Sequence, residues 1–206
     1  MSSHHFVKEN QEPALVILGL EGLDYDTIAP LLEWVPTVVV TEETVEKVIS
    51  LGIKIDLILA SEGFQKENIH LLEEQYPVRF MTAKEGNYLE EGLQYLVASK
   101  HSAVNILGYD HLKVFSLSDK LEFLNIVIWD GPMRYFPVKG GRLKKYFSTG
   151  SLQLHAAEDS FVEMVYAEGS ELIQIKHATF VEVEEGMVEL KAKDLFWVGE
   201  LQGVQP

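Results

Sequence analysis

The sequence predicts an α/β protein in two parts: a Rossmann-like, mostly parallel sheet with flanking helices, followed by a small antiparallel β-sandwich or roll. Up to residue 129, short apolar runs alternate with segments of helical period, which is the pattern of a doubly wound sheet. Beyond the turn signals at residues 130–132 (DGP) and 140–141 (GG), short β-rich runs replace the helical period. We therefore expect a Rossmann-like domain over residues 1–135 and a β-sandwich domain over residues 136–206.

The first expected strand is the apolar run 14–18 (ALVIL), which runs into a glycine-containing turn. Gly19 and Gly22 lack the spacing and the Lys-Ser/Thr pair of phosphate-binding loops, so we interpret them as a structural turn. Asp26 or Thr27 is then placed to cap the first helix.

The clearest unit is strand, helix and strand in residues 37–64. The β-branched run 38–40 (VVV) and the apolar run 57–59 (LIL) both favour buried strands, and the apolar residues between them recur at helical spacing. Parallel strands place their carboxyl-end loops on one edge of the sheet, which is where open α/β sheets bind ligands. Residues 41–44 (TEET) and 60–64 (ASEGF) should therefore lie close together.

The same alternation continues, with helices expected at residues 66–75, 89–98 and 114–124, and strands at 78–81, 103–107 and 125–129. Strand character then recurs at residues 133–138, 152–155, 161–166, 172–176, 179–183 and 188–190. In residues 180–184 (FVEVE), successive side chains fall on opposite faces, as in a strand.

Composition disfavours several classes of function. A net charge of −15 over 206 residues argues against nucleic acid and anionic membranes as partners, because phosphates would be repelled. A nucleotide is compatible with this charge, because Mg²⁺ and a few local cations can offset its phosphates. The absence of cysteine rules out disulfides and thiolate metal sites. No apolar run approaches the roughly 20 residues of a membrane span, and the start of the chain is not a signal peptide, so we expect a cytoplasmic protein.

Residues 51–58 (LGIKIDLI), with the loops 41–44 and 60–64, carry a family resemblance. They resemble the core of the thiamine pyrophosphokinases, in which a loop Ala-Asp-Gly-Gly precedes a helix ending Leu-Gly-Ile-Lys-Pro-Asp and the next strand runs into Gly-Asp-Phe-Asp-Ser. The resemblance implies diphosphate transfer from ATP to thiamine with Mg²⁺, giving thiamine diphosphate and AMP. It also implies thiamine and ATP as ligands, and a homodimer whose active site lies between the subunits.

Two further loops stand where the family has acidic motifs: residues 84–88 (KEGNY) at Lys-Asp-x-Thr-Asp, and residues 108–111 (GYDH) at Gly-Gly-Arg-x-Asp-His. The residues implied to be catalytic are Glu85, Asp110 and His111. Those implied to contact the nucleotide or thiamine are Glu42, Glu43, Ser61 and Asn87, and those implied to bind Mg²⁺ are Glu62, Glu85 and Asp110.

The acidic loops also depart from the family pattern. Ser61 and Gly63 stand at two of its aspartates and Tyr88 at a third, while the fourth loop has no arginine. Mg²⁺ demands near-ideal octahedral oxygen geometry, so these changes weaken, move or remove the metal site. Three hypotheses stay open: an active thiamine diphosphokinase (a transferase), a non-catalytic relative (a pseudoenzyme) that binds thiamine, thiamine diphosphate or a nucleotide as a sensor or partner, and an interaction scaffold.

Each candidate residue also has a structural interpretation. The glutamates are equally typical of solvated or helix-capping acids. Asp110 and His111 are also typical of a loop cap and a surface histidine. Trp197 is interpreted as core or interface packing. The remaining histidines lack ligand spacing and are interpreted as a polar terminus (His4, His5) and as structural residues (His70, His101, His155, His177).

Overall fold

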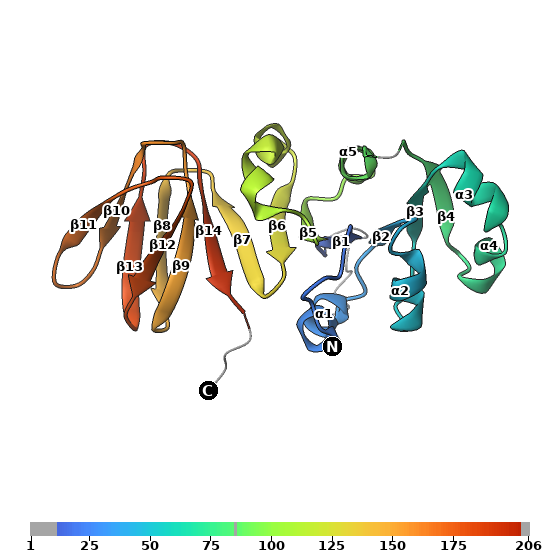
Figure 1. The fold of residues 1–206 in the computed structure, drawn as a ribbon, viewed down its shortest axis with the longest axis horizontal. Coiled ribbons are helices and arrows are strands. Elements are labelled where there is room, and N and C mark those ends of the chain that lie inside the picture. Colours follow the sequence, from blue (N-terminus) through green and yellow to red (C-terminus); the bar gives the residue numbers. More distant parts are fainter. Residues whose placement is uncertain (1–11, 85, 203–206) are drawn as a thin grey trace, which may run out of the picture. The chain divides into compact units, whose positions relative to one another are not determined.

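The structure is a computed structural model that describes residues 12–84 and 86–202. The chain divides into two compact units (Figure 1). One comprises the described residues up to Tyr109 together with Ser118–Ile126, and the other comprises Asp110–Leu117 and the described residues from Val127 onward. No helix in the described part of the chain is long and apolar enough to cross a membrane. Whether residues 1–135 and 136–206 fold as separate domains stays a prediction.

The first unit is built on a parallel sheet, which confirms the predicted fold class of this part. Its strands are β1 (Ala14–Ile17), β2 (Val38–Thr41), β3 (Leu57–Ala60), β4 (Arg79–Thr82) and β5 (Ala103–Leu107). They lie in the order β5-β1-β2-β3-β4 with every neighbouring pair parallel. Each residue of β1, β2 and β3 is buried, as expected for apolar strands that are covered on both faces.

The helical elements are α1 (Tyr25–Leu32), α2 (Val45–Ser50), α3 (Glu62–Glu67), α4 (Leu71–Glu74), α5 (Tyr88–Ala98) and the 3₁₀ segment η1 (His111–Glu122). Figure 1 shows α1 and α2 on one face of the parallel sheet and α5 on the other. The cap of α1 is Asp24, not Asp26 or Thr27 as expected. The Asp24 carboxylate accepts a hydrogen bond from the Thr27 N–H at 2.8 Å.

Two of the expected helices differ from prediction. The helix expected at residues 66–75 is replaced by α3 and α4. The Ser61 hydroxyl caps α3 by accepting a hydrogen bond from the Phe64 N–H, and the Asn68 amide donates to the Phe64 carbonyl where α3 ends. The helix expected at residues 114–124 is the 3₁₀ segment η1, in which the Ser116 hydroxyl donates to the Lys113 carbonyl. Local side-chain hydrogen bonds of this kind compete with regular α-helix.

The strand order reverses at β1, because β2, β3 and β4 lie on one side of β1 and β5 lies on the other. The residues that follow β1 and β5 are in close backbone contact there. Gly19 follows β1, and its N–H donates to the Leu107 carbonyl at 3.3 Å. A Cβ at Gly108, which has a φ of +76°, would lie 2.6 Å from the backbone of Gly19. The Glu21 carboxylate lies against Gly19, since a Cβ on Gly19 would be 2.6 Å from its oxygen. The tight contact supports the structural interpretation of this turn.

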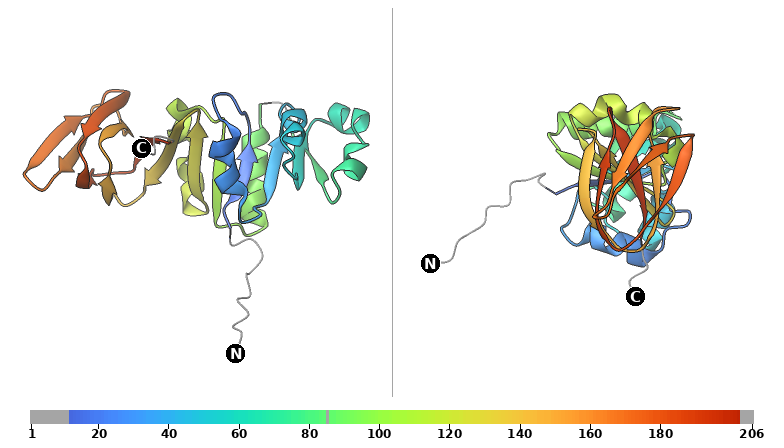
Figure 2. Two further views of the ribbon diagram at one scale, coloured as in Figure 1. Left: turned by 90° about the horizontal axis from the view of Figure 1, so that it is seen from below. Right: turned by 90° about the vertical axis from the view of Figure 1, so that its left-hand side faces the viewer.

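The second unit contains two antiparallel sheets that share one core, as predicted for a β-sandwich (Figure 2). One sheet has the order β12-β9-β14-β7-β6 and the other β11-β10-β13-β8. The bounds are β6 (Asn125–Asp130), β7 (Met133–Val138), β8 (Arg142–Phe147), β9 (Gly150–His155), β10 (Phe161–Val165), β11 (Ser170–Gln174), β12 (Ala178–Val183), β13 (Gly186–Lys191) and β14 (Phe196–Leu201). Leu154 and Phe196 of the first sheet and Met164 and Leu190 of the second belong to this core.

His101 is a buried histidine of the first unit, 5% exposed, with both ring nitrogens hydrogen-bonded. Its Nδ1 lies 3.0 Å from the Ser99 hydroxyl and its Nε2 lies 3.1 Å from the Thr37 hydroxyl. The Ser99 hydroxyl donates to the Tyr95 carbonyl, so it can accept from Nδ1–H while Nε2 accepts from Thr37. These contacts suit the neutral ring, and burial lowers the pKa of His101. The structural interpretation fits this residue.

We expect the neutral state of His101 to make stability depend on pH. The unfolded chain takes up this proton near pH 6.5, whereas the folded chain does so only at lower pH. The free energy of unfolding should therefore be flat above about pH 7 and fall as the pH drops below about 6.5, by at most about 1.4 kcal/mol per pH unit for this group. Urea unfolding between pH 8 and pH 5 measures this slope. His101→Gln should reduce this slope without abolishing it, because burial also lowers the pKa of His155. Replacement of the exposed His177 by Gln should leave the slope unchanged; a slope in His101→Gln equal to that of the parent would contradict the prediction.

Candidate functional site

The carboxylate of Glu42, which follows β2, is the centre of a hydrogen-bond network. Its Oε2 accepts from the backbone N–H of Ser61 at 2.6 Å and from the Ser61 hydroxyl at 2.9 Å. Its Oε1 accepts from the Tyr88 hydroxyl at 2.9 Å. The loops after β2 and β3 therefore meet at one sheet edge, as the parallel strands predict, and the start of α5 joins them.

Protein donors satisfy this carboxylate in its ionised form. Burial alone would raise the pKa of Glu42, but the hydrogen bonds from Ser61 and Tyr88 outweigh burial and hold the pKa below its usual value. The sequence did not reveal the role of Tyr88, which was interpreted only as a residue that stands where the family has an aspartate. It is 7% exposed, and its hydroxyl reaches Glu42 across 46 residues of sequence.

The other candidates of the first unit do not join this network. Glu43 is exposed, and Glu62 is exposed and lies 3.8 Å from the ammonium of Lys66. The Asn87 amide is exposed and donates to Glu91 one turn along α5 at 3.1 Å. Glu85, predicted as a catalytic residue and a Mg²⁺ ligand, lies outside the described residues.

The described residues of this edge do not fit the Mg²⁺ site that the resemblance implies. Both oxygens of Glu42 already accept protein hydrogen bonds, and Ser61 serves as the cap of α3 and as a donor to Glu42. Mg²⁺ needs several oxygens converging on one point in octahedral geometry. Among residues 12–84 and 86–202, the group of acidic and histidine side chains with metal-like spacing lies instead in the second unit.

That group consists of Asp110, His111 and Asp130, whose ligand atoms lie within 4.8 Å of one another. Asp130 ends β6, and its Oδ2 lies 2.7 Å from His111 Nδ1 and accepts from the His111 backbone N–H at 3.0 Å. Asp110 accepts a hydrogen bond from the Leu112 N–H at 3.0 Å, and this bond is the main reason that the pKa of Asp110 lies below its usual value. Asp110 and His111 were predicted; Asp130 was missed, because 19 residues separate it from His111.

A buried aromatic cluster supports His111. Its ring stacks on Tyr135, with ring centres 4.9 Å apart and planes at 2°, and His155 lies edge-on to both rings at 5.5 and 5.6 Å. Gly199 makes room for this arrangement, since a Cβ there would lie 2.4 Å from the Tyr135 ring. The Tyr135 hydroxyl donates to the Gln153 side chain on β9. Sequence spacing did not reveal that His155 belongs beside His111.

The interior of this cluster contains polar atoms without partners. Within the described part of the chain, His155 Nε2 and Trp197 Nε1 are buried and have no hydrogen-bond partner. Burial raises the pKa of Tyr135, and burial together with the charge of His111 lowers the pKa of His155 to about 4. Trp197 is fully buried, as its interpretation as a packing residue expects.

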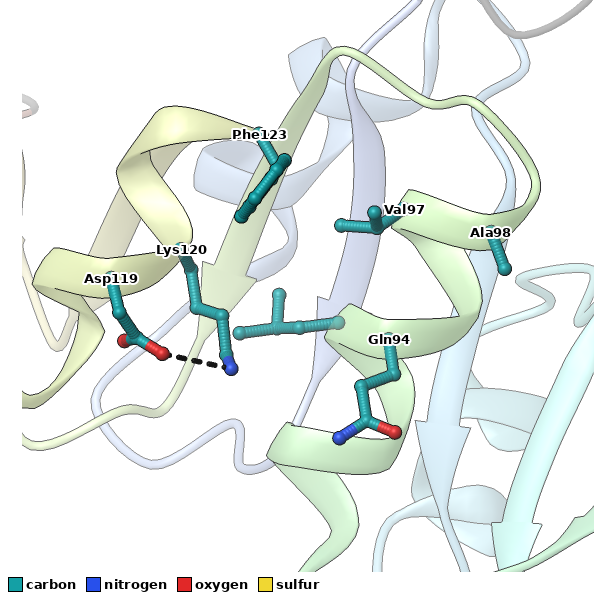
Figure 3. A pocket seen from close by; sticks show the side chains of 7 residues that line it. Gln94, Val97, Ala98, Asp119, Lys120 and Phe123 are labelled. Atoms are coloured by element: carbon teal, nitrogen blue, oxygen red, sulfur yellow. Dashed lines mark ion pairs between the residues drawn. The ribbon is translucent and has the colours of Figure 1, made fainter.

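A groove of about 290 Å³ lies between α5 and residues 119–123 (Figure 3). Its lining is mostly apolar, with Leu93, Val97 and Phe123 as the largest such side chains. Lys120 supplies a cation, but it pairs with Asp119 at 3.0 Å and with Glu90 at 2.8 Å. None of the residues predicted as site residues lines this groove.

Comparison with solved structures shows that the chain has a thiamine pyrophosphokinase-like fold. Among solved structures, it is similar to thiamine pyrophosphokinase from Bacillus subtilis, with a TM-score of 0.69 at 9% identity over 93% of this chain and 100% of that one. The Geobacillus thermodenitrificans enzyme gives a TM-score of 0.68 at 11% identity over 93% and 98%. Thiamin pyrophosphokinase from Candida albicans gives 0.58 at 10% identity over 94% and 90%. No protein-family model matches the sequence, and no curated protein matches it.

Proposed function

We propose that this chain is a non-catalytic relative of the thiamine pyrophosphokinases that binds thiamine or thiamine diphosphate without transferring diphosphate. The observation that carries this proposal is the Glu42 carboxylate, whose two oxygens accept hydrogen bonds from Ser61 and Tyr88. A ligand of Mg²⁺ must offer free lone pairs to the ion, and three protein hydrogen bonds here take up most of the roughly four lone-pair sites of the carboxylate. The similarity of the fold to thiamine pyrophosphokinases supports thiamine as the class of ligand.

The side chains around the network support the same proposal. Glu62 and Glu43 are exposed and lie outside the hydrogen-bond network of Glu42, and Ser61 holds the position of a family aspartate with a neutral hydroxyl. The Glu21 carboxylate covers Gly19 in the loop after β1, where a negative charge opposes a phosphate group. Binding without phosphate transfer agrees with the lack of further acidic side chains in the Glu42 network among the described residues and with the negative charge of Glu21.

The proposal also includes a homodimer, which the family resemblance implies, and a cytoplasmic location, which the composition implies.

One observation favours the alternative, an active thiamine diphosphokinase that uses ATP and Mg²⁺. His111 is held by Asp130 through its Nδ1, which orients the ring as in catalytic His–carboxylate pairs. If this alternative held, Asp110→Ala should abolish the release of AMP from ATP in the presence of thiamine.

Calorimetric titration separates these functions. The full chain is titrated with thiamine, with thiamine diphosphate and with a non-hydrolysable ATP analogue, each with and without Mg²⁺, and AMP release from ATP plus thiamine is measured in parallel. We expect thiamine or thiamine diphosphate to bind with the same affinity in both buffers, and AMP release to stay at the level of the protein-free control.

Two results would overturn the proposal. AMP release that requires both Mg²⁺ and thiamine, and that Asp110→Ala abolishes, would establish the diphosphokinase. If none of the three ligands binds, with or without Mg²⁺, the interaction scaffold would be favoured. A matched control is the exposed Asp194→Ala in place of Asp110→Ala, which should leave every titration unchanged.

A further inference from the structure

The end of α1 exposes two large apolar side chains that are neighbours in the sequence. Trp34 is 72% exposed and Val35 is 86% exposed, directly after the helix and its C-cap residue. Single exposed apolar residues are common on protein surfaces, whereas neighbouring ones form a patch. Tryptophan is enriched among the residues that contribute most to binding at protein interfaces. The end of α1 is therefore a candidate interaction surface.

The backbone at Val35 gives a second, independent observation. Its φ is +52°, in the left-handed region that β-branched residues rarely adopt. The Val35 N–H donates to the Leu32 carbonyl at 3.0 Å, so Val35 ends the helix at a position where glycine is usual. Glycine would end the helix without strain and without an apolar side chain in solvent. Strained residues cluster at functional sites, which favours a role for Val35 beyond helix termination.

The charge at this end of the helix is negative, and no residue of α1 offsets it. A helix C-terminus carries a partial negative charge, which a basic side chain in the last turn usually complements. The last turn of α1 has no basic residue, and its C-cap is Glu33, a further carboxylate. Asp26, Pro30 and Glu33 are all exposed, and their spacing of four and three residues places them on one face of the helix.

The neighbouring sequence adds to this negative charge. Between residues 9 and 46 the chain contains no lysine or arginine, whereas the exposed carboxylates of Glu21 and Asp24 precede α1. Figure 1 shows α2 on the same face of the sheet as α1, and the charges of Glu46 and Lys47 in α2 offset each other. A negatively charged surface attracts a cationic partner and repels nucleic acid and anionic membranes.

We propose that Asp26, Pro30, Glu33, Trp34 and Val35, called here the α1 surface, bind a basic amphipathic segment of a partner protein. An arginine or lysine of the segment would lie over the Trp34 indole in a cation–π contact and pair with the Glu33 carboxylate. Apolar residues of the segment would cover Val35. A cation at this point would also complement the C-terminal end of α1.

The α1 surface is separate from the proposed ligand site. Helix α1 leads from the carboxyl end of β1 to the amino end of the parallel strand β2, so its last residues lie at the amino ends of the strands. The Glu42 network lies at the carboxyl ends. Binding at the α1 surface therefore requires neither thiamine nor a nucleotide.

The test uses the tryptophan fluorescence of the full chain. The chain has three tryptophans, and Trp129 and Trp197 are 7% and 0% exposed, so it is the emission of Trp34 that responds when solvent is displaced. The probe is a synthetic amphipathic peptide of leucine and arginine, and its counterpart of leucine and glutamate is the charge control. At about 0.15 M salt, which screens charges more than about 8 Å apart, we expect the arginine peptide to shift the emission to shorter wavelength. The glutamate peptide should leave the emission unchanged.

Calorimetric titration of variants with the arginine peptide locates the binding surface. Glu33→Lys should weaken binding by about tenfold or more, because it replaces an attraction by a repulsion. Val35→Gly and Trp34→Ser should also weaken binding, because they remove the apolar contact. Neither Glu33→Lys nor Val35→Gly should lower Tm, since the first complements the helix C-terminus and the second removes strain. Weaker binding in these two variants is therefore not a consequence of unfolding.

Two matched controls make the same kinds of change elsewhere in the first unit. Glu67→Lys reverses a charge at the last residue of α3, and Ile69→Ser removes another apolar side chain that is 66% exposed. Both should bind the arginine peptide as the parent does. Equal affinity of the parent, Glu33→Lys and Trp34→Ser, or no binding of the arginine peptide, would overturn the proposal. A shift of the emission to shorter wavelength with neutral phosphatidylcholine vesicles would assign the surface to a membrane instead, and would also overturn it.

Discussion

Gly199→Ala should destabilise the second unit by about 3 kcal/mol. The new Cβ would lie 2.4 Å from one carbon of the Tyr135 ring and 2.7 Å from another. That ring cannot move freely, because it stacks on His111 and its hydroxyl donates to Gln153. Tyr135 is also 1% exposed, so the strain passes into packed neighbours.

Thermal unfolding measures this effect, and a loss of about 3 kcal/mol corresponds to a Tm lowered by roughly 6–12 °C in a chain of this size. The matched control is Gly140→Ala, where a Cβ meets nothing within 4 Å, so its Tm should equal that of the parent. In a Tyr135→Leu background the ring is gone, and Gly199→Ala should cost much less. An equal cost in both backgrounds would show that the Tyr135 ring is not the cause.

The second large effect is expected at Glu42→Ala, about 2–3 kcal/mol of unfolding free energy. The substitution removes the acceptor for the Ser61 N–H, the Ser61 hydroxyl and the Tyr88 hydroxyl together. Tyr88 is nearly buried, so its hydroxyl has little access to water in place of the lost carboxylate. Tyr88→Phe removes a single donor and should cost less, about 1 kcal/mol.

The contribution of Glu42 should also depend on pH in a defined direction. Its folded-state pKa lies below the usual value, so its stabilisation is present above about pH 4.5 and is lost as the pH falls through the folded-state pKa. Urea unfolding of the parent and of Glu42→Ala at pH 7 and at pH 3 checks this, and the difference between them should shrink at pH 3. The matched control is Glu43→Ala, an exposed neighbour that should change stability by less than about 0.5 kcal/mol at either pH. A difference between the parent and Glu42→Ala that stays constant with pH would refute the ionised-acceptor interpretation.

Much of the fold follows from local patterns in the sequence. The buried strands β1, β2 and β3 are mostly apolar and rich in β-branched residues, and this composition and their short length separate them from helices. The helix ends were less predictable. Ser61 was interpreted as a ligand-contacting residue, yet its hydroxyl starts α3 five residues before the expected helix. Short polar side chains act equally well as caps and as ligands, and one sequence does not distinguish the two.

The candidate site could be predicted only in part. Parallel strand order brings residues after β2 and β3 to one edge, so the proximity of Glu42 and Ser61 was foreseeable. The hydroxyl of Tyr88 reaches Glu42 across 46 residues, the carboxylate of Asp130 reaches His111 across 19, and the ring of His155 reaches His111 across 44. Such contacts leave no local pattern.

The sequence by itself determined the alternation of strands and helices in the first half, the change from helical to β-rich character and the sheet edge at which the acidic loops end, because these depend on period, propensity and turns. The tertiary structure alone decided what the side chains at that edge do. Whether a carboxylate faces an ion, a hydroxyl or solvent depends on ångström-scale distances between segments far apart in the chain. Here those distances satisfy Glu42 with protein donors and bring Asp110, His111 and Asp130 together.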